Sequence, residues 1–420
     1  MTTVESGIQA MGVRARAAFD AVRMTPAATR TAALYAMADA LELGRASILT
    51  ANAADLGRAR EGGMDEAMLD RLALNPGRVA AMAAAVRTIA EQTDPVGAED
   101  ERWTRPSGLD IARVTVPIGV LAVIYESRPN VTADAAALCV RSGNAVILRS
   151  GSDALASAMA IHAALVEGLT EAGLPGDIVQ LVTTPDRAAV GGLLTGLNGA
   201  IDLIVPRGGR SLVARVQSEA RAPVLGHLEG LCHTYLHASA DPEKARKIVL
   251  NAKMRRVTVC GATETLLVDA SAPETLLQLV AEDLLAAGCV LRGDARTCAM
   301  VPRATPAIEA DWTTEYLAPI LAIRVVDGLA GAMAHIARHG SGHTDAIVAE
   351  DAVAAAEFLD KVDSAIVMHN ASTQFADGGE FGFGGEIGIA TGRLHARGPV
   401  GAAQLTTYKY IVRAVGAVRP

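Results

Sequence analysis

The sequence predicts an α/β fold built from two doubly wound domains, and three observations support this. Short, continuously apolar segments such as Gly119–Tyr125 alternate with longer helical segments such as Asp153–Ala172, as expected when parallel strands are covered by helices on both faces. A second series of alternating segments begins near Cys232, and 420 residues suffice for two or three domains. Half of the residues are hydrophobic but only 3% are aromatic, so we expect a core of Ala, Val, Leu and Ile.

Composition and charge exclude several classes of protein. A net charge of −8 argues against nucleic acid as the main partner. No apolar run reaches the roughly 18 residues of a membrane span, and the N-terminus lacks the apolar region of a secretory signal. Five scattered cysteines fit a reducing compartment better than a disulfide framework. We therefore expect a cytoplasmic protein.

The first third of the chain predicts helices followed by an exposed strand. Apolar residues recur on one helical face between Ile8 and Val22. Thr25 and Pro26 predict an N-cap and a first helical position, for a helix that ends before Gly44. Asp110–Val116 alternates polar and apolar residues, which is typical of a half-exposed strand.

The rest of the chain repeats strand and helix patterns. We predict strands at Gly119–Tyr125, Ala145–Leu148, Ile178–Val182, Asp202–Val205, His233–Leu236, Thr265–Val268, Ile320–Val326, Ala346–Val348, Ala365–His369 and Leu405–Val412. We predict helices at Asp153–Ala172, Asp186–Leu194, from about Gly209, and at Asp241–Ala252, Ala272–Ala287, Ala330–Arg338 and Ala352–Lys361.

Cys260 is the first candidate for chemistry. It precedes an apolar strand, and Lys253, Arg255 and Arg256 come shortly before it in the chain. Neighbouring positive charge stabilises a thiolate and lowers the pKa of the thiol. A thiolate here would be a nucleophile, whereas the alternative is a small buried hydrophobic residue.

Glycine and histidine patterns give weaker signals. Val205–Arg210 follows a strand and opens a helix, so its N–H groups could face a phosphate, although an ordinary tight turn explains the same residues. His335, His339 and His343 have a spacing that zinc sites use. Glycines break the helix before the last of them, so we favour solvated histidines at a helix end and expect no metal. A serine hydrolase is disfavoured because no G-x-S-x-G motif is present.

Two stretches, Tyr125–Ala154 and Phe375–Gly401, resemble the gamma-glutamyl phosphate reductases, also called glutamate-5-semialdehyde dehydrogenases, within the aldehyde dehydrogenase superfamily. The motifs R-P-N-V-T, L-H-A-R-G-P and L-T-T-Y-K carry the resemblance, which covers essentially the whole chain. It implies an aldehyde-dehydrogenase-like fold with three parts. These are a cofactor-binding domain of residues 1–105, 118–228 and 365–395, a catalytic domain of residues 229–364, and a small β oligomerisation arm of residues 106–117 and 396–420.

The resemblance also implies catalytic roles. Cys260, in its N-A-K…C…T-E-T-L-L-V context, corresponds to the nucleophile of the family. Asn130 falls where the superfamily has the amide donor of its oxyanion hole; the alternative is an asparagine that caps the following helix. Glu229 is displaced from the E-L-G-G register of the superfamily's general base, and we do not assign it as a base.

Cofactor and substrate residues follow from the same resemblance. Arg149 replaces a cofactor-contacting lysine and suits the 2′-phosphate of NADPH, which arginine can hold bidentately. Glu315 matches a glutamate that binds the nicotinamide ribose; the alternative is a surface residue. We assign further cofactor contacts to Ser150, Ser152, Pro206, Gly208 and Gly209. Candidates for the substrate's carboxylate and phosphate are Arg128, Arg207 and Arg256.

The activity that the resemblance implies is the NADPH-dependent reduction of L-glutamyl 5-phosphate to L-glutamate 5-semialdehyde and phosphate, through a cysteine thioester, in proline biosynthesis. Glutamate 5-kinase would supply this labile substrate. The first alternative is NAD-dependent oxidation of another small aldehyde, which the displaced Glu229 register disfavours. The second is a non-catalytic protein on the same scaffold, which the joint presence of Cys260, Asn130 and Glu315 disfavours.

Two extended segments have no obvious place in either domain. Asp110–Val116 lies between the helical region and the first buried strand, and Leu405–Val412 lies beyond the last domain strand. We expect them to pair with each other, and an unpaired strand edge is a template for a second subunit. The sequence therefore predicts a homo-oligomer in which the tail joins the arm; a monomer whose tail covers its own sheet edge is the alternative.

Overall fold

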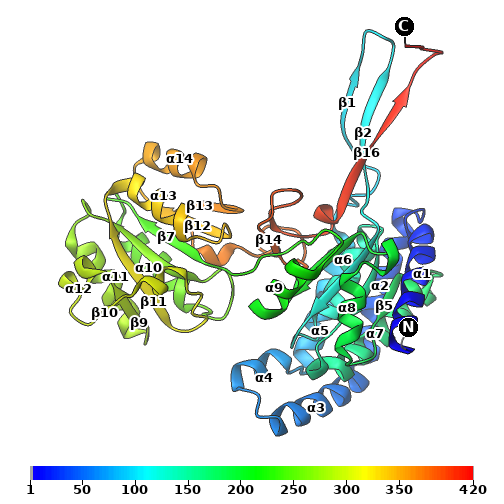
Figure 1. The fold of residues 1–420 in the computed structure, drawn as a ribbon, viewed down its shortest axis with the longest axis horizontal. Coiled ribbons are helices and arrows are strands. Elements are labelled where there is room, and N and C mark those ends of the chain that lie inside the picture. The colour runs from blue at the N-terminus through cyan, green and yellow to red at the C-terminus, as the bar shows by residue number, and fades with distance from the viewer. Residues whose placement is uncertain (1–2, 420) are drawn as a thin grey trace. The chain divides into compact units, whose positions relative to one another are not determined.

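The computed structural model describes residues 3–419, which divide into two compact units (Figure 1). Unit 1 comprises the described residues of Met1–Gly226, Gly382–Gly388 and Val400–Pro420, and unit 2 comprises His227–Phe381 and Ile389–Pro399. The helices of unit 1 are α1 (Thr3–Val22), α2 (Ala27–Leu43), α3 (Arg45–Glu61), α4 (Glu66–Leu72), α5 (Pro76–Glu91), α6 (Val131–Arg141), α7 (Leu155–Glu171), α8 (Arg187–Leu194) and α9 (Arg210–Glu219).

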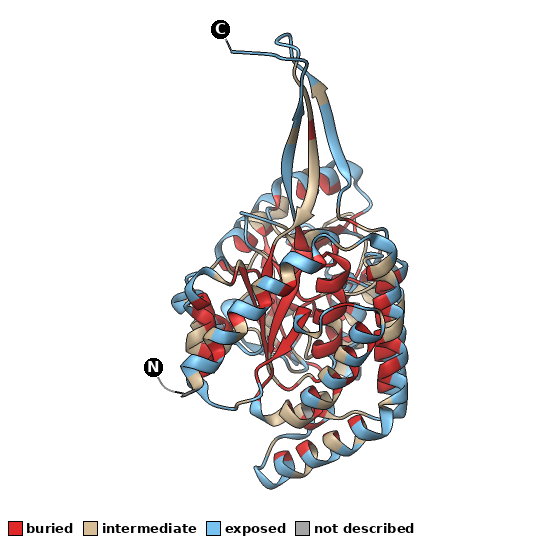
Figure 2. Ribbon diagram, turned by 90° about the vertical axis from the view of Figure 1, so that its right-hand side faces the viewer, coloured by how far each residue is buried: buried red, intermediate tan, exposed pale blue. Residues whose placement is uncertain are grey.

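A parallel sheet forms the centre of unit 1. Its strands are β3 (Val120–Tyr125), β4 (Ala145–Arg149), β5 (Val179–Leu181) and β6 (Leu203–Arg207), in the order β5-β4-β3-β6. Every residue of β3 is buried, because α1 and α8 pack on one face of the sheet and α6 contacts β3 and β4 on the other. Figure 2 shows the buried residues gathered in this sheet and on the helix faces against it. The predicted strands of this domain are confirmed.

The starts of α5 and α2 differ in chemistry. The side chain of Asn75 accepts the N–H of Arg78 and Pro76 takes the first helical position, which is a standard helix start. Our prediction for α2 was wrong at its N-cap, since Pro26 occupies that position. The hydroxyl of Thr25 instead donates to the carbonyl of Ala21 at the end of α1, so it is not free to cap α2.

Unit 2 contains a larger parallel sheet. Its strands are β7 (Cys232–Leu236), β8 (Thr263–Asp269), β9 (Val290–Gly293), β10 (Thr305–Pro306), β11 (Ile320–Val326), β12 (Thr344–Val348) and β13 (Ile366–His369), in the order β10-β9-β11-β8-β7-β12-β13. The helices are α10 (Pro242–Met254), α11 (Glu274–Ala286), α12 (Ala295–Met300), α13 (Gly328–His339) and α14 (Ala352–Lys361), and β14 (Ile389–Ala390) pairs with β15 (Gly398–Pro399).

Alternate residues of the unit 2 strands face opposite helix layers. Leu266 and Val268 of β8 pack with α10 and α11 on one face. Leu267, between them in sequence, packs with α13 and α14 on the other face. This is the doubly wound arrangement that the strand–helix alternation predicts. The short elements β9, β10 and α12 were not predicted, because they carry too few residues for a clear hydrophobic period.

The arm is a separate antiparallel sheet of unit 1, with the order β1-β2-β16. It consists of β1 (Glu99–Thr104), β2 (Asp110–Pro117) and β16 (Thr406–Arg413). The predicted pairing of the two extended segments is confirmed, from Thr406 opposite Pro117 to Arg413 opposite Asp110. β1 and β16 are largely exposed, whereas β2 between them is mostly half-buried (Figure 2), and Tyr410 of β16 packs edge-to-face on Trp103 of β1.

The observed boundaries differ from the predicted ones in two places. Residues 99–104 belong to the arm and not to the cofactor domain, because β1 pairs with β2; its sequence, E-D-E-R-W-T, has no apolar alternation that would predict a strand. Residues 365–395 were placed in the cofactor domain and 396–420 in the arm, but residues 365–381 and Ile389–Pro399 belong to unit 2, where β13 extends the sheet by pairing with β12. Among residues 3–419, no helix is both long and apolar enough to cross a membrane.

A buried ion pair joins α10 to β8. Lys253 is 0% exposed and Glu264 is 1% exposed, and Lys253 Nζ lies 2.5 Å from Glu264 Oε2. The other carboxylate oxygen of Glu264 accepts the N–H of Leu317 at 3.3 Å, and Leu317 has a φ of +50°. The pair therefore also holds the unusual backbone of the segment between β10 and β11.

We expect Lys253→Ala to lower the free energy of unfolding by about 3–5 kcal/mol, because it leaves the Glu264 carboxylate buried without its cation. Denaturant unfolding at pH 7 measures this. The matched control is Lys244→Ala, which removes an exposed pair with Glu350 and should cost at most about 1 kcal/mol. Equal losses in the two variants would contradict the prediction.

Candidate active site

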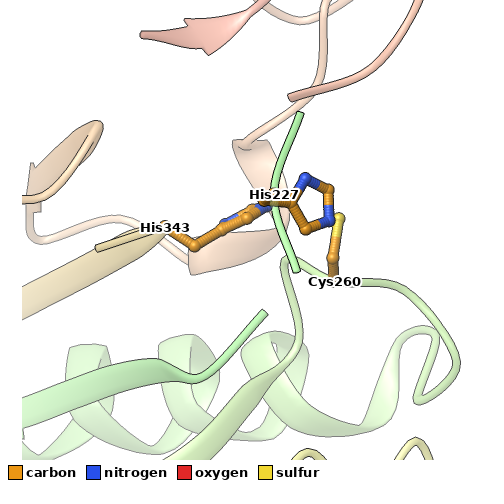
Figure 3. Close-up of side chains that lie close together, drawn as sticks. All are labelled: His227, Cys260 and His343. Atoms are coloured by element: carbon orange, nitrogen blue, oxygen red, sulfur yellow. The ribbon is translucent and has the colours of Figure 1, made fainter. Parts of the chain in front are cut away.

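Cys260, His227 and His343 converge at one edge of the unit 2 sheet (Figure 3). Cys260 comes just before β8, His343 directly before β12, and His227 in the loop before β7. Those strands are neighbours in the order β8-β7-β12, and the amino ends of parallel strands meet at one edge. The Cys260 sulfur and one nitrogen of each imidazole lie within 4.8 Å of one another.

Hydrogen bonds fix the two imidazoles. His227 Nδ1 lies 2.7 Å from the carbonyl oxygen of Ile389, which can only accept, so this nitrogen carries the proton. His343 is 0% exposed, and its Nδ1 lies 2.9 Å from Thr344 Oγ1. His343 Nε2 is buried and has no hydrogen-bond partner within residues 3–419. The rings meet edge-to-face with centroids 4.8 Å apart.

This setting lowers the pKa of Cys260 well below its usual value. The partial burial of Cys260 by itself would raise this pKa, because burial disfavours the charged thiolate. The positive charge of His343 and the hydrogen bond and charge of His227 outweigh it. The geometry therefore supports a thiolate paired with an imidazolium, the activated form of a nucleophilic cysteine.

The cations that the sequence suggested for this role are not the ones the structure provides. Lys253 is paired with Glu264 in the core, and the Arg255 guanidinium lies 3.4 Å from the side-chain oxygen of Gln374. Arg256 is exposed and only its carbonyl takes part in the local hydrogen bonds, as an acceptor from Gln374. Proximity in the chain thus misidentified the source of positive charge.

Cys232 is a neighbour of the site and not a second nucleophile. It is fully buried, and its thiol donates to the carbonyl oxygen of Cys260 at 3.0 Å. Burial, with the nearby carboxylate of Asp345, raises the pKa of Cys232 well above its usual value. Cys232 therefore stays a thiol and anchors the backbone that carries Cys260.

Gly230 brings a third loop to the site. A Cβ at this position would lie 2.1 Å from the carbonyl oxygen of Cys260, so only glycine fits. The Gly230 N–H donates to Glu315 Oε1 at 3.0 Å. Burial raises the pKa of Glu315, which is half-buried and not the surface residue of the alternative interpretation. Its predicted contact with the nicotinamide ribose stays a prediction.

In unit 1, the predicted cofactor residues lie at the carboxyl edge of the sheet. Arg149 ends β4 and Arg207 ends β6, on either side of β3. Arg149 Nε is buried and has no hydrogen-bond partner among the described residues. The N–H of Gly209, at the start of α9, donates to Glu126 Oε2 at 3.1 Å.

These features fit the phosphates of a dinucleotide. The order β5-β4-β3-β6 reverses at β3, and ligands of such sheets bind beyond the carboxyl ends at that reversal. An anionic oxygen already occupies the N-terminus of α9, where a phosphate oxygen would be stabilised in the same way. A Cβ at Gly208 would lie 2.5 Å from Glu126 Oε2 and 2.8 Å from Leu212 Cδ2, so a side chain here would require both of those side chains to move. Pro206, in β6, precedes this turn.

The remaining cofactor candidates have local partners. Ser150 is buried and its hydroxyl donates to the carbonyl of Gly151 at 2.9 Å, so only a rearrangement would free it for a ligand. Ser152 is exposed at the start of a short 3-10 turn. Ser152 is therefore the more accessible of the two hydroxyls.

Asn130 does not cap the helix that follows it. It occupies the N-cap position of α6, but its side chain makes no capping bond. The amide donates instead to Asp134 Oδ2 at 2.9 Å, and burial raises the pKa of Asp134 to about 6. The capping alternative is thus wrong, whereas the oxyanion role stays a prediction.

The three arginines proposed for the substrate differ in their settings. Arg128 is half-buried after β3, and Arg256 is exposed after α10. Arg207 lies 3.7 Å from Glu386, and both belong to unit 1. Their contacts with substrate stay predictions.

The expectation of solvated histidines at the end of α13 was wrong. His335, His339 and His343 are at most 8% exposed. The ring of His335 packs on those of His233 and His339, with centroids 5.4 and 4.5 Å away. Burial, followed by the neighbouring imidazoles, lowers the pKa of His335 to about 2, so it is neutral. His343 does not belong to this group of rings and lies beside Cys260.

His227 and His343 are the functional residues that sequence reasoning missed. Sequence analysis assigned no role to His227 and considered His343 only as part of a helical spacing. The available signal was that each precedes a predicted strand, as Cys260 does. Using it would have required the strand order, which places β8, β7 and β12 side by side.

We expect the alkylation rate of Cys260 by iodoacetamide to reach half its maximum well below pH ~8.5, the value for a free thiol. His343→Gln and His227→Gln should move this midpoint to higher pH, because each removes a cation that stabilises the thiolate. Mass spectrometry of the Cys260 peptide, with a chelator present, follows the reaction. His369→Gln, an exposed site on β13, is the control, and an unchanged midpoint in both active-site variants would refute the assignment.

Comparison with known proteins agrees with the fold and the candidate site. Residues 3–307 match the aldehyde dehydrogenase family. The chain is 63% identical to a gamma-glutamyl phosphate reductase of Caulobacter sp. (strain K31), over 100% of both chains. It is 62% identical to the one from Hyphomonas neptunium, over 98% of this chain and 96% of that one.

Solved structures show the same relationship. The crystal structure of gamma-glutamyl phosphate reductase from Thermotoga maritima matches with a TM-score of 0.95 and 42% identity, covering 98% of this chain and 100% of that one. An acetylating aldehyde dehydrogenase from Geobacillus thermoglucosidasius, at 19% identity and a TM-score of 0.69, covers 99% of this chain and 98% of that one and shares the fold. The predicted fold class is confirmed, and the chain belongs to the aldehyde dehydrogenase family, in its gamma-glutamyl phosphate reductase branch.

Proposed function

We propose that this protein reduces L-glutamyl 5-phosphate to L-glutamate 5-semialdehyde and phosphate with NADPH, as a step of proline biosynthesis. Relatives named for this reaction match over essentially the full length at about 60% identity. The observation that carries the proposal is the Cys260 thiol between two imidazoles, with its pKa lowered.

The first step is attack by the Cys260 thiolate on the acyl carbon of the substrate. The new C–S bond replaces the bond to phosphate, which leaves a thioester on Cys260. The overall reaction consumes one proton, and phosphate is a poor leaving group without it. An imidazolium beside Cys260 holds that proton, so we assign its delivery to the departing phosphate to His227 or His343.

The second step returns the enzyme to its starting state. NADPH, when bound, supplies a hydride to the thioester carbon. The C–S bond of the resulting thiohemiacetal breaks, the aldehyde leaves, and Cys260 is a thiolate again without any attack by water. The imidazole that protonated the phosphate takes up a proton from solvent, which accounts for the one proton that the reaction consumes. This explains why the reaction needs no general base at Glu229.

Asn130 is our candidate for stabilising the oxyanion that forms in both steps. Its amide is oriented by the hydrogen bond to Asp134, on the first turn of α6. One such donor is worth about 3–4 kcal/mol of transition-state stabilisation. Arg128, Arg207 and Arg256 are our candidates for the substrate's carboxylate and phosphate.

We assign the cofactor to the carboxyl edge of the unit 1 sheet. Arg149, with its unpartnered Nε, suits the 2′-phosphate of NADPH. Ser150 and Ser152 follow it in the chain, and the turn of Pro206, Gly208 and Gly209 would face the other phosphates. Glu126 must turn aside from Gly209 for this, and Glu315 would hold the nicotinamide ribose.

We further propose a homo-oligomer assembled through the arm. β16 is an edge strand of the arm sheet, and Tyr408, Tyr410 and Val412 are each more than half exposed on it. Exposed apolar side chains on an edge strand invite pairing with another chain. The acyl phosphate substrate hydrolyses readily, so we also propose glutamate 5-kinase as the partner that supplies it.

The reverse reaction separates the proposal from its alternative. Oxidation of the semialdehyde with NADP should require inorganic phosphate, because phosphate must release the acyl group from Cys260. Cys260→Ala should lose turnover in both directions and still bind NADPH, whereas Cys298→Ala should stay within a few-fold of the wild type. Oxidation that proceeds equally without phosphate would establish the aldehyde-oxidising alternative instead.

We expect Arg149→Ala to narrow the preference for NADPH over NADH by about 1.5–3 kcal/mol, the range for a hydrogen bond to a charged group. The ratio of kcat/KM for the two cofactors measures this. Arg187→Ala, on the neighbouring helix α8, is the control for a general loss of positive charge. An unchanged ratio in Arg149→Ala would redirect the assignment to Ser152 or Arg207.

Deleting residues 408–420 should leave the chain folded and reduce its mass in solution to that of a monomer. The deletion spares Leu405, whose carbonyl accepts the side-chain N–H of buried Asn144 and ties the tail to unit 1. Sedimentation at micromolar concentration measures the mass. Deleting only residues 416–420, which lie beyond β16, should change nothing, and a full-length monomer would contradict the assembly.

A further inference from the structure

We propose that His227, Cys260 and His343 form a binding site for one zinc ion, and that zinc at this site blocks the nucleophile. The binding does not depend on the proposed function; only the consequent inhibition rests on it. Sequence analysis expected no metal, because it grouped His343 with His335 and His339.

The donor set and its spacing suit zinc. Thiolate sulfur and imidazole nitrogen are preferred zinc ligands, at about 2.3 and 2.0–2.1 Å from the metal. Tetrahedral coordination then places neighbouring ligand atoms roughly 3.3–3.6 Å apart. The three candidate atoms already lie within 4.8 Å of one another. Closing the remaining gap takes about 1 Å of movement, which rotation of the half-buried Cys260 and His227 side chains can supply.

The second nitrogen of each imidazole is held as metal-binding histidines require. Such histidines almost always donate their other N–H to an oxygen, which fixes the ring and its tautomer. His227 Nδ1 donates to the Ile389 carbonyl, and His343 Nδ1 lies beside the Thr344 hydroxyl. The metal would bind the Nε2 atoms: that of His343 is buried without a hydrogen-bond partner among the described residues, and at His227 the metal would replace the hydrogen bond between the imidazole and the Cys260 thiol.

The neighbouring groups leave the fourth coordination position open. The Cys232 thiol is bound to the Cys260 carbonyl, and the Glu315 carboxylate accepts the Gly230 N–H. Among the described residues, neither belongs to the group of converging candidate ligand atoms, so water or another small ligand would take the fourth position. Metal binding displaces the proton of the thiolate–imidazolium pair and occupies the sulfur lone pair and both imidazoles, which leaves no nucleophile and no proton carrier.

A zinc titration of the chelator-treated full-length protein, with a chromophoric competitor, tests the site without any substrate. The wild type should bind one zinc per chain. Cys260→Ser, His227→Gln and His343→Gln should each weaken binding at least about tenfold, since losing an outer-shell partner alone costs about 10–100-fold. Thr344→Val, which keeps the shape of a buried side chain and removes only the hydroxyl beside His343, should fall in that outer-shell range.

Matched controls lie away from the site. Cys298→Ser and His369→Gln should bind zinc as the wild type does, because one is in α12 and the other ends β13 at the opposite edge of the sheet. Cobalt in place of zinc should give a thiolate-to-metal charge-transfer absorption that Cys260→Ser loses and Cys298→Ser keeps. Equal weakening in the control variants would overturn the proposal.

Alkylation of the wild type provides a test that does not depend on folded variants. One equivalent of zinc should slow the reaction of iodoacetamide with Cys260 at least about tenfold, and excess chelator should restore it. An unchanged alkylation rate with one zinc bound would place the metal elsewhere and overturn the proposal. If the protein binds zinc in this way but fails to reduce the acyl phosphate, the metal site stands and the proposed function falls.

Discussion

The close approach of Gly230 to Cys260 is the constraint on which the rest of the site depends. Because a Cβ at Gly230 would lie 2.1 Å from the Cys260 carbonyl oxygen, the loop before β7 and the loop before β8 can touch only through a bare backbone. That contact fixes His227 on one side of Gly230 and Cys232 on the other. The Gly230 N–H then binds Glu315, so one backbone position joins all three loops.

Two opposing effects act on the pKa of the Cys260 thiol: burial raises it, and the neighbouring imidazoles lower it. Comparison with the other cysteines shows that the imidazoles are the unusual feature. Burial is the main cause that raises the pKa of Cys289 to about 11, and burial alone raises the pKa of Cys139 further still. Cys260 experiences the same desolvation, which by itself would make it an inert thiol. The two imidazoles outweigh this effect and lower the pKa of Cys260. Removing one imidazole would therefore raise the pKa of Cys260 and favour an inert buried thiol over a nucleophilic thiolate.

Sequence reasoning succeeded where local composition determines the answer. The short, continuously apolar run Gly119–Tyr125 predicts a strand covered on both faces, and β3 is buried throughout. It failed for β1, whose six residues are mostly charged and pair only because β2 lies beside them. A strand that forms because a partner strand lies beside it cannot be recognised from its own hydrophobic pattern.

The same distinction applies to the site. Cys260 could be identified from its own loop and from the family resemblance of the surrounding motif. Its true cations could not, because His227 and His343 lie far from it in the chain and are joined to it by the order of the strands. The three cations nearest in sequence proved misleading for a physical reason. Lys253 is held by Glu264 in the core, and Arg256 is turned out to solvent.

The location of the site explains why histidine must supply the positive charge. In unit 1 the predicted anion site lies at the carboxyl edge of the sheet, where α9 begins and its N–H groups favour negative charge. In unit 2 the nucleophile lies at the amino edge, where α10 and α13 end before Cys260 and His343. A helix C-terminus carries partial negative charge, which disfavours a thiolate and favours a cation. At this edge the thiolate therefore depends on the two imidazoles for its stabilisation.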